Sequence, residues 1–181
     1  MKTPLWEKRP EIFIEYDSKQ REYHREKDRR CIFEQWRKQL GIHKAGGNFP
    51  VMVAKKYFQD SEYSVEDDFL LVRNRRKRES NEGFKRLCRI FGEERINRVI
   101  AEADEVFSFR GKGKSGGDPD LFVFKDEKHS WSCLFVEVKE DDQITENQKI
   151  LFPILETYLC PVFIARVRRR EFTHNPRQEI D

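Results

Sequence analysis

Three charged residues lie in or beside two apolar segments that read as β-strands. Asp120 opens the run DLFVF, whereas Glu137 and Lys139 interrupt the run LFVEVK. Charged side chains in such segments cost free energy unless they are paired or bind an ion. Two carboxylates and an ammonium group are also what metal-assisted hydrolysis of a phosphodiester requires. These three residues are therefore the first candidates for chemistry.

Strand geometry predicts that these side chains can meet. Successive side chains of a strand point to opposite faces, so Glu137 and Lys139 share one face, and the valines on either side of Glu137 share the other. A hairpin across the polar segment KDEKHS would bring Asp120 within metal-bridging distance of Glu137. Two carboxylates this close repel each other unless a cation lies between them.

A hard divalent cation prefers oxygen ligands. Asp120 and Glu137 are therefore predicted to hold Mg²⁺ or Mn²⁺, together with the backbone carbonyl of Val138. Such an ion lowers the pKa of a bound water molecule and neutralises charge on phosphorus. Lys139 is placed to orient or activate that water. The alternative is a solvated strand face on which Glu137 and Lys139 form an ordinary surface ion pair.

Composition limits the class of protein to which this site can belong. The chain has 181 residues, which suits one globular domain with elaborations, and its net charge is +3. Affinity for a polyanion must then come from local basic patches. The sequence has no apolar run of membrane-spanning length and no signal-peptide pattern, so we expect an intracellular protein of the cytoplasm, nucleoid or nucleus. The four cysteines lack the spacing of a zinc site.

The remaining sequence must supply the elements that position the site. The patterns predict helices and strands in alternation, which is typical of an α/β fold with a mixed central β-sheet flanked by helices. Besides the hairpin, the predicted elements are helices over 82–91 and 93–105, a short strand over 106–110, a helix over 146–159 and a strand over 160–167. An amphipathic helix is also expected before Gly41.

The motif around these residues resembles a known nuclease signature. Gly117-Asp118-Pro119-Asp120 followed by Glu137-Val138-Lys139 resembles the PD-(D/E)XK motif. The longer pattern GGDPDLFVF and CLFVEVKEDDQITENQKILF resembles the VRR-NUC family of virus-type replication-repair nucleases, which includes the nuclease domain of Fanconi-associated nuclease. The resemblance covers roughly residues 80–167 and implies a restriction-endonuclease-like core that cuts DNA with a metal ion.

The resemblance also implies two further site residues. A glutamine on the helix after the E-x-K motif is predicted to contact the site and orient Lys139 or the scissile region, and Gln148 stands at that place. A glutamate on an upstream helix would be a further metal ligand. Glu82 is the candidate, although three more acids occupy the same region: Glu93, Glu94 and Glu102.

The predicted organisation has three parts. Residues 1–79 are expected to form a charged, largely helical N-terminal extension, residues 80–168 the nuclease core, and residues 169–181 a polar tail. The extension is predicted either to pack on the core or to meet a replication or repair protein, and related stand-alone nucleases suggest a homodimer. Basic residues expected to contact phosphates lie in two groups: Lys112 and Lys114, and Arg73, Arg75, Arg76, Lys77 and Arg78. The arginines of ARVRRR form a third possible group at the C-terminal end.

The sequence thus predicts a metal-dependent DNA endonuclease, structure-specific for branched, flapped or Holliday-junction DNA in replication and repair. Two alternatives stay open. One is a defence or restriction-type nuclease that cuts ordinary duplex DNA. The other is a DNA-binding or assembly protein that keeps a nuclease-like fold without catalysis.

Overall fold

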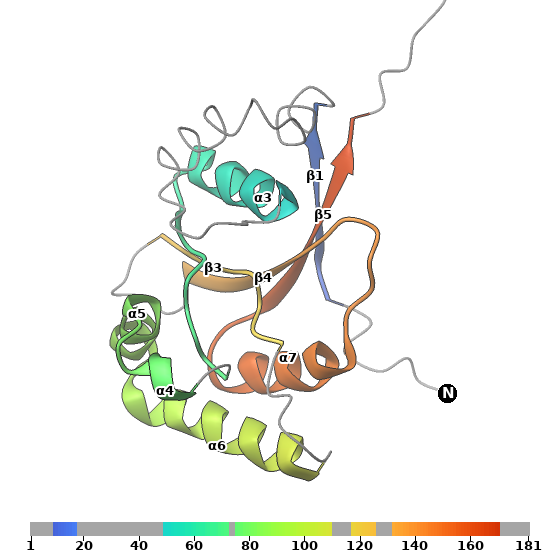
Figure 1. Ribbon diagram of the computed structural model, residues 1–181. Helices are drawn as coiled ribbons and strands as arrows, with labels where there is room; N and C mark the ends of the chain where they lie inside the picture. Colours follow the sequence, from blue (N-terminus) through green and yellow to red (C-terminus); the bar gives the residue numbers. More distant parts are fainter. Residues whose placement is uncertain (1–8, 18–48, 73–74, 110–116, 126–131, 171–181) are drawn as a thin grey trace, which may run out of the picture.

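The computed structural model describes residues 9–17, 49–72, 75–109, 117–125 and 132–170. These residues form a mixed five-stranded sheet with helices on both faces (Figure 1). The sheet order is β1-β5-β4-β3-β2. The strands are β1 (Glu11–Tyr16), β2 (Ser64–Glu66), β3 (Leu121–Phe124), β4 (Cys133–Lys139) and β5 (Val162–Arg169). The predicted α/β class is confirmed.

Strand direction changes within the sheet. β5 pairs in parallel with both β1 and β4, whereas β3 is antiparallel to β4 and to β2. The antiparallel β3–β4 pair is the hairpin that the sequence predicts. The parallel β4–β5 pair needs a crossover connection, and helix α7 (Glu146–Tyr158) supplies it. The end of β4 and the start of α7 are therefore joined by the short segment 140–145.

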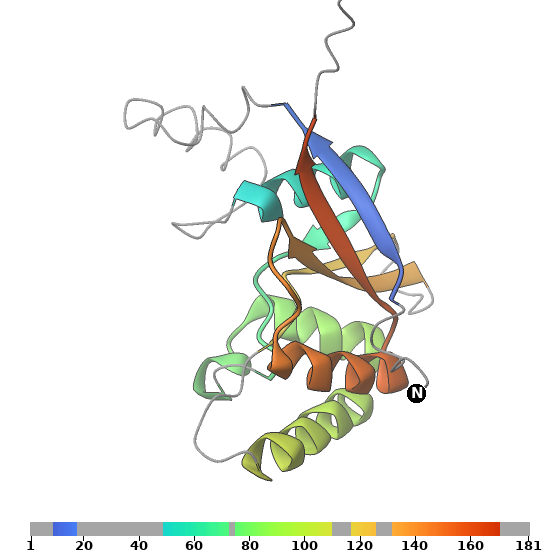
Figure 2. The same cartoon turned by 90° about the vertical axis from the view of Figure 1, so that its right-hand side faces the viewer.

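The helices cover the two faces of the sheet separately, as Figures 1 and 2 show. Helix α3 (Phe49–Asp60) packs on one face. The opposite face is covered by α5 (Glu82–Phe91), α6 (Glu93–Phe109) and α7, with the one-turn helix α4 (Arg75–Arg78) beside them. Among the described residues, no helix is both long and apolar enough to cross a bilayer.

Alternation along β4 divides the core into two layers, as predicted. Val136 and Val138 belong to the cluster under α3, and Phe135 belongs to the cluster under α5, α6 and α7. Glu137 and Lys139 follow Phe135 on the second face at intervals of two residues. The strand therefore packs with its valines and presents its charged residues toward α7.

The division of the chain at residue 80 stays a prediction, but the sheet includes strands on both sides of that residue. Strand β1 forms an edge of the sheet, with Ile14 and Tyr16 buried, and β2 forms the other edge. Both strands and α3 precede residue 80. β1 carries two glutamates, Glu11 and Glu15, among apolar residues, and its long-range pairing with β5 identifies it as part of the sheet. The amphipathic helix expected before Gly41 lies outside the described residues.

The short strand predicted over 106–110 is wrong for its described residues 106–109, because α6 continues to Phe109. Ile96, Val99 and Ala103 are buried at helical intervals, and Phe107 continues the same face against the core. A short aromatic run next to a glycine-rich loop has no periodicity of its own, so the helix before it decides its conformation.

Candidate active site

Asp120 and Glu137 are brought together by the register of the hairpin. Leu121 and Val136 are partners across β3 and β4, so Asp120, one residue before β3, lies beside Glu137. The Asp120 Oδ2 atom accepts a hydrogen bond of 2.9 Å from the backbone N–H of Val138. The approach of the two carboxylates that the sequence predicts is therefore present.

The turn before Asp120 is held by its own contacts. Asp118 accepts hydrogen bonds from the backbone N–H groups of Val72 at 2.9 Å and Leu71 at 3.3 Å. Gly117 has φ of 114°, and a Cβ built there would lie 3.2 Å from the backbone nitrogen of Gln148. A glycine is required because the turn uses a left-handed conformation and touches α7. The sequence gives no indication of this contact.

Glu137 is deeply buried, and only one of its two carboxylate oxygens has hydrogen-bond partners among the described residues. Its side chain is 4% exposed, and its Oε1 atom accepts hydrogen bonds from Gln148 Nε2 at 2.5 Å and from Lys139 Nζ at 2.9 Å. Its Oε2 atom is buried without a hydrogen-bond partner among the described residues. Burial, and then repulsion from Asp120, raise the pKa of Glu137 to about 8 against the opposing effect of Lys139 and Gln148.

Lys139 joins Glu137 to a residue that the sequence analysis missed. Its Nζ atom lies 2.9 Å from Glu137 Oε1 and 2.9 Å from Asp142 Oδ2. Burial lowers the pKa of Lys139, but the two carboxylates outweigh burial and leave it raised, so the side chain is held as an ammonium. The acidic run EDD directly after the strand is the signal that could have identified Asp142.

Gln148 links helix formation to the site. It is the third residue of α7, and its side chain and that of the N-cap residue Thr145 form a capping box. Its Oε1 atom accepts from the Thr145 N–H at 2.9 Å, which directs its Nε2 donor to Glu137. The expected contact between Gln148 and the site is present, and it is made with Glu137. Its role in catalysis stays a prediction.

Glu82 is placed differently from the other candidates. It lies in the first turn of α5, its side chain is 77% exposed, and it forms a 2.7 Å ion pair with Lys85. Within the described part of the chain, no group of three His, Cys, Asp or Glu side chains is arranged to hold a metal ion. The structure thus does not bring Glu82 together with Asp120 and Glu137. A helix-start carboxylate stabilised by the helix dipole accounts for its position.

The basic residues predicted to contact DNA are only partly described. Lys112, Lys114 and Arg73 lie outside the described residues, as do the side chains of Arg75 and Arg76.

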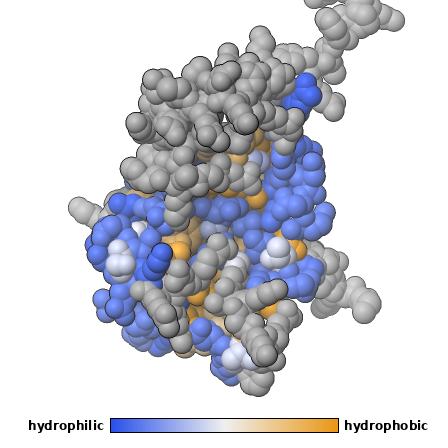
Figure 3. Space-filling model, in the orientation of Figure 1, coloured by the Kyte–Doolittle hydropathy of each residue, from blue (hydrophilic) through white to orange (hydrophobic). Residues whose placement is uncertain are grey.

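Lys77 is exposed, whereas Arg78 is buried, donates to the Val72 carbonyl at 3.3 Å and lies over the ring of Phe84. Arg78 is therefore less accessible to a phosphate than Lys77, and its predicted contact with DNA stays a prediction. Figure 3 shows that the described surface in that view is largely hydrophilic, in keeping with the charged composition.

The fold and the site together define a class of protein. A mixed sheet carries an aspartate at the start of one hairpin strand and a Glu-x-Lys motif on the next, with both carboxylates directed to one place. This is the arrangement of a PD-(D/E)XK nuclease core with a restriction-endonuclease-like fold.

The family model of the VRR-NUC domain matches residues 61–169, and the chain belongs to this family. Membership assigns it to the nuclease-type proteins that process DNA. The match begins before residue 80 and includes β2, which is also a strand of the central sheet. A search of curated proteins gave no significant match.

Proposed function

We propose that this protein is a metal-dependent DNA endonuclease whose catalytic residues are Asp120, Glu137 and Lys139. The observation that carries the proposal is the Oε2 atom of Glu137, which is buried beside a second carboxylate and has no hydrogen-bond partner among the described residues. A buried carboxylate oxygen without a donor is costly for the fold alone. A bound cation would offset that cost.

The donor set fits a hard divalent cation. Glu137 Oε2, the Asp120 carboxylate and the Val138 carbonyl would supply oxygen ligands to Mg²⁺ or Mn²⁺. When bound, the ion would lower the pKa of a water molecule and neutralise charge on the phosphate. Asp120 is already fixed by the Val138 N–H, so little rearrangement of this ligand is required.

The neighbouring side chains have separate tasks. Lys139, held by Glu137 and Asp142, keeps a positive charge at the site and can donate a hydrogen bond to the attacking water or to a phosphate oxygen. Gln148 fixes the Oε1 atom of Glu137 and leaves Oε2 without a hydrogen-bond partner among the described residues. Gln148 is thus a positioning residue for the carboxylate.

Cleavage of labelled linear duplex, flapped and four-way DNA by one preparation, with Mn²⁺, Mg²⁺ or EDTA, tests the function. We expect cleavage only with a metal ion, and faster cleavage of flapped or four-way DNA than of linear duplex. Equal rates on all three substrates would favour a nuclease of the restriction or defence type. Absence of metal-dependent cleavage on every substrate would refute catalysis and favour a DNA-binding role.

Variants at the site separate catalysis from folding. Asp120→Asn and Lys139→Ala are expected to lower the cleavage rate by at least about a hundredfold, the usual effect of losing a catalytic group. The matched controls are Glu94→Gln and Lys56→Ala, which remove the same charges from exposed helix ion pairs. Controls that lose as much activity as the site variants would contradict the assignment.

A further inference from the structure

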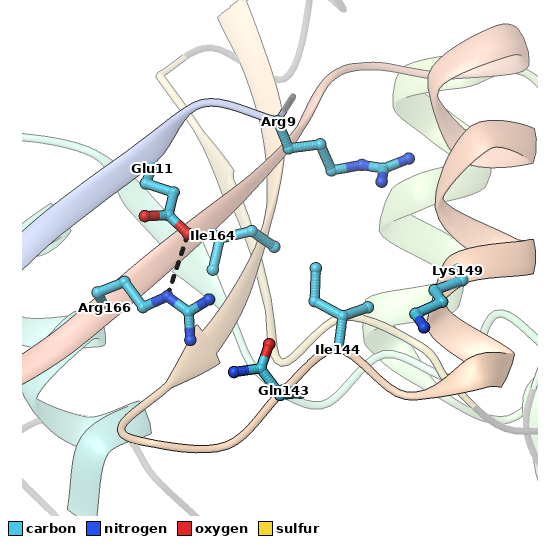
Figure 4. Close-up of a pocket in the computed structure, with 7 residues that line it drawn as sticks. All are labelled: Arg9, Glu11, Gln143, Ile144, Lys149, Ile164 and Arg166. Atoms are coloured by element: carbon cyan, nitrogen blue, oxygen red, sulfur yellow. Dashed lines mark hydrogen bonds and ion pairs between the residues drawn. The ribbon is translucent and has the colours of Figure 1, made fainter. Parts of the chain in front are cut away.

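We infer that a pocket beside the proposed catalytic residues binds one unpaired nucleotide of the substrate strand. This inference rests on the proposed function for its biological meaning, but the binding it describes needs neither metal nor cleavage. The pocket has a volume of about 400 Å³ and lies between β1, β5, the start of α7 and the segment 140–145 (Figure 4). A volume of this size is in the range of small-molecule sites, about 300–1,000 Å³.

The register of the sheet places this pocket next to the site. Ile164 and Arg166, which line the pocket from β5, are the partners of Glu137 and Lys139 on β4. Paired residues of neighbouring strands point to the same face and lie about 5 Å apart. A ligand in the pocket therefore lies one strand away from the proposed catalytic side chains and on their face of the sheet.

A chain of contacts also connects the pocket wall to Lys139. Arg166 donates through Nη1 to the backbone carbonyl of Asp142 at 3.1 Å, and the Asp142 carboxylate pairs with Lys139. Arg166 also donates through Nε to Glu11 at 3.1 Å, the contact drawn as a dashed line in Figure 4. These bonds use two of the five N–H groups of the guanidinium, and the others can reach a ligand.

The lining groups carry both signs of charge and an apolar element. Figure 4 shows Ile144 and Ile164 between Arg166 and Glu11 on one side and Lys149 on the other. Ile144 is half-buried, so part of its side chain can contact a ligand. Lys149 pairs with the exposed Glu146, a surface contact that a phosphate can replace at little cost.

This combination favours a nucleotide over simpler ligands. A small anion alone would meet the Glu11 carboxylate, and a cation would meet Arg166 and Lys149. Arg9 adds no available charge, because its guanidinium binds Glu156 through two hydrogen bonds. A nucleotide has an anionic phosphate for Lys149 and a neutral base whose polar edge can bond to Glu11 and Gln143.

The inference restricts the substrate. A base in a duplex is paired and stacked, and it must leave the stack before it can enter a pocket. The pocket therefore predicts a preference for DNA with an unpaired nucleotide near the cleaved bond. Preference for a flap over a linear duplex would then depend on residues of the pocket.

Methyl NMR of the full chain labelled at isoleucine tests the inference without metal. Deoxyadenosine monophosphate is expected to shift the signals of Ile144 and Ile164 saturably, while Ile14, on the opposite face of the sheet, does not move. Deoxyadenosine or inorganic phosphate alone should bind at least about tenfold more weakly, since each lacks one half of the contacts. No saturable shift at the two isoleucines up to about 10 mM nucleotide would overturn the inference.

A charge reversal supplies the matched control. Lys149→Glu should weaken nucleotide binding at least about tenfold, and Lys56→Glu, which reverses a lysine of a similar helical ion pair on α3, should leave it unchanged. The isoleucine spectrum itself reports whether each variant is folded. Equal binding by inorganic phosphate, or an unchanged affinity of Lys149→Glu, would overturn the nucleotide assignment. Binding without any metal-dependent cleavage would refute the proposed function and leave the pocket standing.

Discussion

Glu137→Gln is expected to make the metal-free protein more stable at alkaline pH while it abolishes metal-dependent cleavage. Glutamine has the shape of glutamate, and its amide oxygen can accept from Gln148 and Lys139 as Oε1 does now. Its amide N–H₂ group would then replace the unsatisfied Oε2 atom in a site whose other carboxylate is that of Asp120. The substitution thus removes a buried charge and adds a donor next to a carboxylate.

The magnitude follows from the pKa of Glu137. The folded protein raises this pKa from 4.5 to about 8, which at about 1.4 kcal/mol per pH unit corresponds to about 5 kcal/mol. Because the folded pKa lies above the unfolded one, this contribution to stability is fully present below pH 4.5 and is lost as pH rises to about 8. The free energy of unfolding of the wild-type protein in EDTA should therefore fall between pH 4.5 and about pH 8. The Glu137→Gln variant should not show this decrease, because it lacks the titrating carboxyl group.

Urea unfolding in EDTA at pH 5, 7 and 9 measures the effect. The two proteins should be closest in stability at pH 5, and Glu137→Gln should exceed wild type at pH 9 by a few kcal/mol. At this chain length that difference corresponds to roughly 10 °C in Tm. Glu94→Gln is the control, since its carboxylate is exposed. Parallel pH profiles for wild type and Glu137→Gln would refute the buried, half-satisfied state of Glu137.

Further predictions concern the metal and the turn before Asp120. Mn²⁺ must compete with the proton on Glu137, so the affinity of the protein for Mn²⁺, measured by calorimetry, should rise from pH 6 to about pH 8 and then level off. Below about pH 8, binding of the ion should release a proton. A Mn²⁺ affinity independent of pH would argue against Glu137 as a ligand. Gly117→Ala should lower the free energy of unfolding by about 1–3 kcal/mol, because the alanine meets both a left-handed φ and the start of α7. Gly92 has φ of 84° but no atom near an added Cβ, so Gly92→Ala should lower the free energy of unfolding by less than Gly117→Ala does. An equal decrease for the two variants would show that the contact of residue 117 with α7 contributes nothing.

The sequence by itself determined the hairpin, and it identified Asp120, Glu137 and Lys139 as the candidate residues that the hairpin joins. Alternation in LFVEVK assigns Glu137 and Lys139 to one face, and the spacing to DLFVF sets the register that brings Asp120 beside Glu137. Both inferences use only the twofold periodicity of strands and a short connection. The sheet confirms them because local patterns and a hairpin involve neighbouring parts of the chain.

Only the tertiary structure decided how these side chains are held. The bond from Gln148 to Glu137 and the ion pair of Asp142 with Lys139 depend on how α7 and segment 140–145 return over the sheet. The exposed position of Glu82 and the place of β1 in the sheet depend on packing between distant segments. Burial is likewise a property of the assembled layers, so no spacing in the sequence shows that one oxygen of Glu137 lacks a partner among the described residues.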